Sequence, residues 1–95
     1  MKQVAVGLLG FGTVGTGVYR VLTENKKSIE HRERLEINVK RILVRDLTTE
    51  PNLSMAPMEL FCTNYDDIIN DEEISIVVEC MGGTRPAREF ILRAL

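Results

Sequence analysis

A short apolar stretch that runs into closely spaced glycines constrains the fold of this chain most strongly. Residues 4–9 (VAVGLL) form a continuous apolar run, which is typical of a strand covered on both faces in a parallel sheet. From Thr13 onward the apolar spacing becomes helical, with one face made of Val14, Val18, Val21 and Leu22. The glycines between these patterns therefore connect a buried strand to an amphipathic helix.

The connecting residues 10–15 (GFGTVG) have the spacing GxGxxG. This spacing alone is weakly specific, but a strand before it and a helix after it are the context in which it binds a dinucleotide. We expect Gly10 to permit the tight turn, Gly12 to let the backbone approach a pyrophosphate, and Gly15 to let helix and strand pack closely. The N–H groups and the dipole of the helix start would favour the anion.

The remaining pattern alternates strands with helical or irregular segments. A second strand is predicted around residues 37–44, a short one at 60–63 and another buried one at 74–78. Residues 66–70 favour one or two helical turns, and Pro86 suits the start of a last helix with Phe90 and Ile91 on its apolar face. The first helix is expected to reach about residues 26–28, and the charge-dense residues 25–36 are interpreted as its solvated end and a loop. Residues 47–59 are predicted to form a loop.

This order predicts an α/β fold, a doubly wound parallel sheet of the Rossmann type with strand order 3-2-1-4. We expect residues 1–95 to form one incomplete NAD(P)-binding domain, with no substrate or regulatory domain. A fifth strand is not predicted, so the apolar strand at residues 74–78 would be an uncovered edge. Such edges recruit other strands, and we therefore expect a homodimer or larger assembly through it.

Composition excludes several other classes of protein. The chain is 44% hydrophobic and 27% charged, with a net charge of -2, which does not favour binding to nucleic acid or an anionic membrane. The uncharged residues 3–19 contain five glycines, which argue against a signal peptide or membrane helix. Cys62 and Cys80 lie in separate apolar segments and indicate buried reduced thiols in a soluble cytoplasmic protein, with no metal site.

Residues at the end of the second strand are expected to contact the adenosine ribose of the dinucleotide. A carboxylate about 20 residues beyond the glycines would indicate NAD, but here the strand ends about 30 residues past Gly15, at Arg45 followed by Asp46. A guanidinium at this place would pair with the 2′-phosphate of NADP. Asp46 leaves NAD open, and the less favoured alternative is that Arg45 is only a surface cation at a strand end.

The end of the strand at residues 74–78 carries a second pair of glycines. In a doubly wound sheet this strand adjoins the first one at the point where the ligand crosses. We expect the cofactor's nicotinamide half to lie along Cys80, Met81, Gly82 and Gly83. A simple turn into the last helix would explain the two glycines as well.

Three segments together resemble the amino-terminal domain of homoserine dehydrogenase. They are residues 6–15 (VGLLGFGTVG), 44–46 (VRD) and 77–87 (VVECMGGTRPA). The resemblance implies a parent enzyme that interconverts L-homoserine and L-aspartate 4-semialdehyde with NAD(P)H, towards threonine, methionine and isoleucine. It also implies that Phe11, Thr13 and Val14 bind the cofactor beside the glycines, and that Arg45 takes the NADP phosphate. The family's catalytic lysine and metal-binding loop have no counterpart here, so we expect no catalysis by these 95 residues.

Two alternatives to this function remain open from the sequence. The domain could belong to another NAD(P)-dependent reductase of amino-acid metabolism, which would carry a different substrate domain. It could also be a stand-alone dinucleotide-binding or redox-sensing module.

Overall fold

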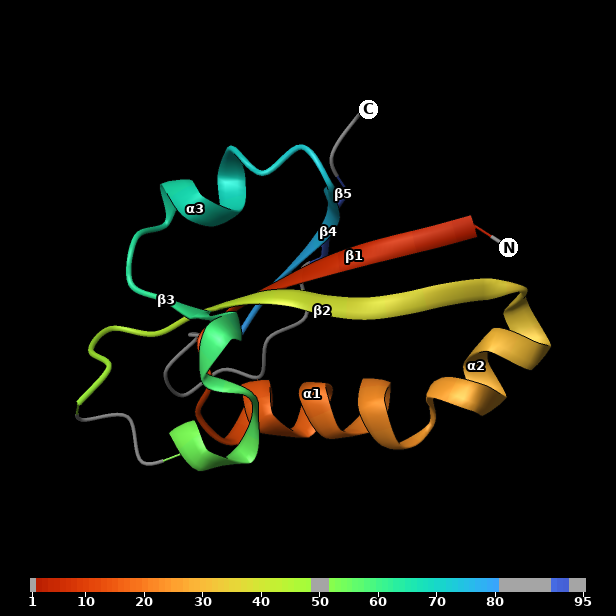
Figure 1. Ribbon diagram of the computed structural model, residues 1–95, viewed down its shortest axis with the longest axis horizontal. Helices are drawn as coiled ribbons and strands as arrows, with labels where there is room; N and C mark the ends of the chain where they lie inside the picture. The colour runs from red at the N-terminus through yellow and green to blue at the C-terminus, as the bar shows by residue number, and fades with distance from the viewer. Residues whose placement is uncertain (1, 49–51, 81–89, 93–95) are drawn as a thin grey trace.

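A computed structural model describes residues 2–48, 52–80 and 90–92. Its elements along the chain are β1 (Lys2–Leu9), α1 (Thr13–Glu24), α2 (Lys26–Glu33), β2 (Leu35–Leu43), the 3-10 turns η1 (Leu53–Met55) and η2 (Met58–Leu60), β3 (Phe61–Cys62), α3 (Asp66–Ile69), β4 (Ile74–Glu79) and β5 (Phe90–Leu92). Figure 1 shows the sheet between α1 and α2 on one side and α3 on the other.

The strands form one sheet in the order β3-β2-β1-β4-β5. β1 is central and pairs in parallel with both β2 and β4, and β3 extends the parallel set beyond β2. The predicted Rossmann-type order 3-2-1-4 is therefore confirmed. This arrangement brings the carboxyl ends of β1, β2, β3 and β4 to the same edge of the sheet.

Each face of the sheet has its own apolar core. On the α1 face, Leu8 and Ile42 are fully buried, and Val14, Val18 and Leu22 of α1 pack against their cluster. On the opposite face, Ile68 of α3 packs with Leu9, Leu43, Cys62, Ile74 and Val77. Burying one such side chain stabilises the fold by about 1.5–3 kcal/mol, so both faces of the central strands contribute to the core. This explains why β1 and β4 read as continuous apolar runs.

The helical segment differs from the prediction in two ways. Val21 was assigned to the buried face of α1, but 56% of it is exposed. The charged residues 25–36 were interpreted as the solvated end of the first helix and a loop, but α1 ends at Glu24 and a separate helix, α2, occupies most of them. The loop assignment was wrong because Lys, Glu and Arg are good helix formers, Lys26 pairs with Glu30 one turn on, and Arg34 ends the helix in the left-handed conformation.

The last described segment also differs from the prediction. A helix was expected there, but Phe90–Leu92 form β5, antiparallel to β4, with Ile76 opposite Leu92 and Val78 opposite Phe90. Pairing satisfies backbone N–H and C=O groups of β4 that a helix would leave exposed. The expectation of an uncovered edge at residues 74–78 is therefore wrong over residues 76–78. The dimer inferred from that edge loses its structural basis.

Candidate functional site

The glycine loop leaves β1 through a backbone conformation that favours glycine. Gly10 has a φ of 108°, a value that L side chains rarely adopt. Its N–H donates to the carbonyl of Leu43 at the end of β2 (2.8 Å). The turn predicted from Gly10 is thus present and is tied to the neighbouring strand.

Gly12 is the N-cap of α1 and faces open space. Among the residues that the structure describes, a Cβ added to it would have no atom within 4 Å, and its φ of -81° is open to any residue. Its carbonyl accepts hydrogen bonds from the backbone N–H (2.9 Å) and the hydroxyl (2.8 Å) of Thr16. The absent side chain at Gly12 therefore serves neither the turn nor the packing, and it leaves room beside the helix start for a ligand.

Gly15 has the packing role that the sequence predicted. A Cβ added to it would lie 2.3 Å from the carbonyl oxygen of Gly10 and 3.6 Å from the Cβ of Cys80. The first turn of α1 can approach the ends of β1 and β4 this closely only without a side chain at this position.

The other three residues of the glycine loop, Phe11, Thr13 and Val14, differ in how deeply they are buried. Phe11 is buried and makes edge-on ring contacts with Tyr19 (5.7 Å between centroids) and Phe61 (5.2 Å). Its side chain anchors the loop in the core, so it offers a ligand its backbone alone. Thr13 is exposed at the helix start, and Val14 is half-buried against the α1-side core.

Arg45 and Asp46 follow β2 at the same edge of the sheet, and both are exposed. The Oδ1 atom of Asp46 accepts hydrogen bonds from the backbone N–H (2.8 Å) and the hydroxyl (2.7 Å) of Thr48. These bonds lower the pKa of the Asp46 carboxyl. The Asp46 carboxylate thus forms local hydrogen bonds within the turn that follows β2. Arg45 is exposed to solvent at the strand end.

Cys80 directly follows β4 and lies beside the glycine loop. Its N–H donates to the carbonyl of Leu9 (2.8 Å), which joins the ends of β1 and β4. Burial raises the pKa of its thiol to about 11, and the Glu79 carboxylate adds to the shift. Such a thiol is a packing group rather than a nucleophile. The predicted site residues Met81, Gly82 and Gly83 lie outside the described residues.

One residue that the sequence analysis did not select contacts the loop. The side-chain amide of Asn52 donates a hydrogen bond to the carbonyl oxygen of Phe11 (3.0 Å). The two residues are 41 positions apart, so no local pattern in the sequence indicates this contact. It joins the segment after β2 to the glycine loop.

A groove of about 750 Å³ runs along α1 away from these polar groups. Its walls are Val14, Gly17, Val18 and Val21 on the helix and Val6, Ile76 and Val78 on the sheet. Leu22 and Ile37 also line it, as does Thr13, whose side chain is polar. The lining is otherwise apolar, so the groove does not suit a phosphate.

Two kinds of feature are absent from the described part of the chain. No helix there is long and apolar enough to span a membrane, and no group of three or more His, Cys, Asp or Glu side chains there could hold a metal ion.

Comparison with known proteins agrees with this geometry. A family model described as the NAD-binding domain of homoserine dehydrogenase matches residues 10–95. The homoserine dehydrogenase of Bacillus subtilis is 33% identical over 95 residues, which cover all of this chain and 22% of that protein. That of Corynebacterium glutamicum is 41% identical over 94 residues, or 99% of this chain and 21% of that protein. The chain thus spans about a fifth of the length of these relatives.

Solved structures of the same enzyme share the fold. Homoserine dehydrogenase from S. aureus at pH 7.0 superimposes with a TM-score of 0.77 and 36% identity, over 88% of this chain and 21% of that chain. The enzyme from Thiobacillus denitrificans gives a TM-score of 0.71 and 44% identity, over 82% and 18% of the two chains. A glycine loop between a central parallel strand and a helix, a matching family model and these relatives lead to one assignment. The chain belongs to the homoserine dehydrogenase family, in the region of its NAD-binding domain.

Proposed function

We propose that these residues hold the adenosine and pyrophosphate of NAD(P)H in an oxidoreductase that interconverts L-homoserine and L-aspartate 4-semialdehyde. The observation that carries the proposal is the open space at Gly12, where a Cβ would meet nothing within 4 Å at the N-terminus of α1. Family membership, which implies a nicotinamide dinucleotide cofactor, supports it. We also propose that residues 1–95 are part of one NAD(P)-binding domain. The whole enzyme would be cytoplasmic and would serve threonine and methionine biosynthesis.

The residues of the loop suit the charge of a pyrophosphate. The first N–H groups of an α-helix have no partner within the helix, and its dipole places a partial positive charge at the same point. The N–H groups of Gly12 and Thr13 would donate to the phosphate oxygens, while Gly15 keeps the helix close to the strands. When bound, the cofactor supplies the hydride, and the protein supplies position and electrostatics.

We further propose that NADP is the preferred cofactor. Arg45 is exposed at the end of β2, where a Rossmann-type sheet reads the adenosine ribose. Its guanidinium would pair with the 2′-phosphate. The neighbouring Asp46 accepts two hydrogen bonds from Thr48, which makes it less available to hold a free ribose diol. Cys80 and residues 81–83 are proposed to border the nicotinamide half.

Calorimetric titration of NADPH into the chain and into a Gly12→Val variant tests the proposal. The new side chain would occupy the space assigned to the pyrophosphate, so binding should be lost. Gly17→Val is the matched control, because Gly17 also has no atom within 4 Å of an added Cβ but lies a turn further along α1. Equal affinity of all three proteins would remove the glycine loop from the site.

A further inference from the structure

We propose that Asn52 is a positioning residue for the dinucleotide, holding the Phe11–Gly12 peptide so that its N–H faces the pyrophosphate. The inference rests on the proposed function and adds to it a residue outside the glycine motif. It starts from the 3.0 Å hydrogen bond that the Asn52 amide donates to the Phe11 carbonyl.

The geometry of the peptide unit links this bond to the ligand side. The C=O of Phe11 and the N–H of Gly12 belong to one planar unit, and in the trans form they point in opposite directions. The described residues contain no cis peptide. A partner that fixes the carbonyl on one side therefore fixes the direction of the N–H on the other. Donation to the carbonyl also polarises the unit and makes the N–H a stronger donor.

The Gly12 N–H is available for this role. Over residues 2–48, 52–80 and 90–92, no backbone hydrogen bond engages it, and the space around Gly12 is open. An amide at the N-cap of a helix has no acceptor within the helix. It is therefore a donor that an oxyanion could use.

Neighbouring contacts hold the chain on both sides of the Phe11–Gly12 peptide, but they do not restrain the rotation of the peptide plane. The hydrogen bond from Asn52 does. The Phe11 ring is held between Tyr19 and Phe61, and the next carbonyl, that of Gly12, is held by Thr16. Glycine allows a peptide beside it to rotate more freely than any other residue does. A hydrogen bond on the Phe11 carbonyl is what restrains that rotation.

Asn52 is itself fixed to the scaffold. It is the N-cap of η1, and its carbonyl accepts a hydrogen bond from the N–H of Met55 (3.0 Å). The residues that follow it, Leu53, Ala56 and Leu60, pack against the core cluster that contains Phe11 and Phe61. Figure 1 shows this segment, in green, beside the start of α1. Its amide is thus a partner held in place by the fold.

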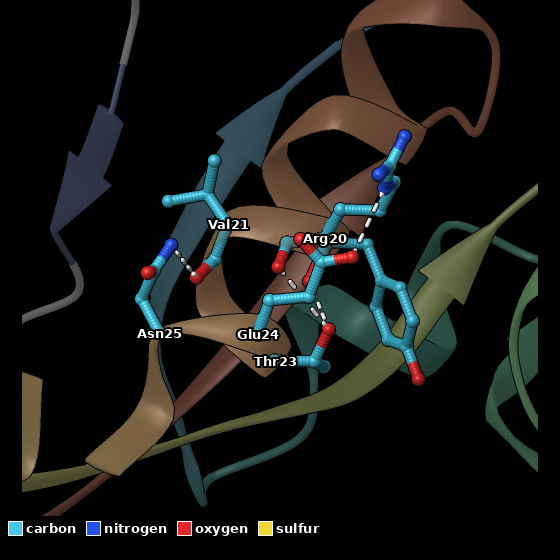
Figure 2. Close-up of polar contacts among 6 residues, drawn as sticks. Arg20, Val21, Thr23, Glu24 and Asn25 are labelled. Carbon is cyan, nitrogen blue, oxygen red and sulfur yellow. Dashed lines mark hydrogen bonds and ion pairs between the residues drawn. The ribbon is translucent and has the colours of Figure 1, made fainter. Parts of the chain in front are cut away.

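The experiment compares Asn52→Ala with a matched control, Asn25→Ala. Asn25 also donates its side-chain amide to a backbone carbonyl, that of Val21 (3.2 Å), at the far end of α1, as Figure 2 shows. Both changes remove one side-chain-to-backbone hydrogen bond. Asn52→Gln retains the amide donor and serves as the conservative variant. Binding of NADH and of NADPH is measured by calorimetry, and the Gly12 amide resonance is followed by NMR without ligand.

We expect Asn52→Ala to weaken both cofactors by the same factor, about three- to tenfold for one hydrogen bond, because both carry the pyrophosphate. The Gly12 amide resonance should move in Asn52→Ala and remain in place in Asn25→Ala. Asn52→Gln should bind more tightly than Asn52→Ala. Unchanged affinity and an unchanged Gly12 resonance in Asn52→Ala, with the unaltered chain binding normally, would overturn the positioning role alone. An unaltered chain that binds neither cofactor would overturn the proposed function and this inference with it.

Discussion

A Cβ atom on Gly15 would lie 2.3 Å from the carbonyl oxygen of Gly10. The strand end and the first turn of α1 therefore meet through backbone atoms, and this contact sets the position of the helix N-terminus over the sheet edge. The same region of α1 contains Gly17, where an added Cβ meets no atom within 4 Å. Substituting these two glycines of α1 is therefore expected to change the stability of the chain in opposite directions.

Gly15→Ala should destabilise the chain by about 1–3 kcal/mol, since a methyl group in this contact forces backbone to shift. Gly17→Ala should instead stabilise it, by up to about 1 kcal/mol, because alanine is the better helix former. Urea unfolding followed by circular dichroism measures both. A stabilising Gly15→Ala would show that the helix and strand do not meet as closely as described.

Arg45→Ala should weaken NADPH binding by about 1–3 kcal/mol and NADH binding much less, because only NADPH offers the 2′-phosphate to the guanidinium. Arg32→Ala is the control, since Arg32 is an exposed arginine on α2 that pairs with Glu33. Calorimetry with both cofactors gives the comparison. Equal losses for NADH and NADPH would mean that Arg45 does not read the phosphate.

The 95-residue chain should not oxidise L-homoserine above the blank at any concentration of NADP. It spans about a fifth of the length of its relatives, and the resemblance places the family's catalytic lysine outside it. A spectrophotometric assay of NADPH formation provides the measurement. Sustained turnover by the purified chain would contradict the placement of the catalytic residues outside this region.

Lys40 joins β2 to the segment before β4 through ion pairs with Asp71 (2.7 Å) and Glu73. The bond from Lys40 lowers the pKa of the Asp71 carboxyl below 3.8, and Asp71 and Glu73 raise the pKa of Lys40 above 10.5. The stabilisation is therefore present between these two values. It is lost as the pH falls through the lowered pKa of Asp71 or rises through the raised pKa of Lys40.

Lys40→Met should accordingly cost about 0.2–1 kcal/mol of unfolding free energy at pH 7. The difference from the unaltered chain should shrink at pH 3, because this pH lies below the ordinary carboxyl pKa of 3.8, so the unfolded chain already binds a proton at Asp71. Lys27→Met, on the exposed face of α2, should show no such dependence. Urea unfolding at the two pH values decides, and an equal difference at both would exclude the Asp71 pair as its source.

Cys80 and Cys62 should react slowly with a thiol-specific disulfide reagent at pH 8. Both thiols are buried, burial raises the pKa of Cys62, and the pKa of Cys80 is raised to about 11. On that value about one Cys80 thiol in a thousand is ionised at pH 8. Single Cys→Ser variants report the labelling of each thiol separately. Unfolding the chain in urea should expose both thiols and increase their labelling rates. Labelling of the native chain at the rate of the unfolded one would contradict this burial.

Local patterns in the sequence were enough to predict the part of the fold in which neighbouring residues share one environment. The apolar run of β1, the glycines and the spacing of Val14, Val18 and Leu22 carry their signal within 20 residues or so, because burial imposes a period on the local pattern. The strand order followed from the same pattern, and so did the packing role of Gly15. Asp66–Ile69 and Ile74–Glu79 were located for this reason too.

Features that depend on partners distant in sequence could be seen only in the folded chain. Phe90–Leu92 pairs with β4 as a strand although its local spacing favours a helix, because the edge of β4 offers backbone partners. The charged segment before β2 became a helix that contacts that strand. The bond from Asn52 to Phe11 crosses 41 positions, and only the folding of the segment after β2 against the core brings that amide to the glycine loop. Local propensity cannot encode such contacts, since each depends on where the rest of the sheet has already placed its partner.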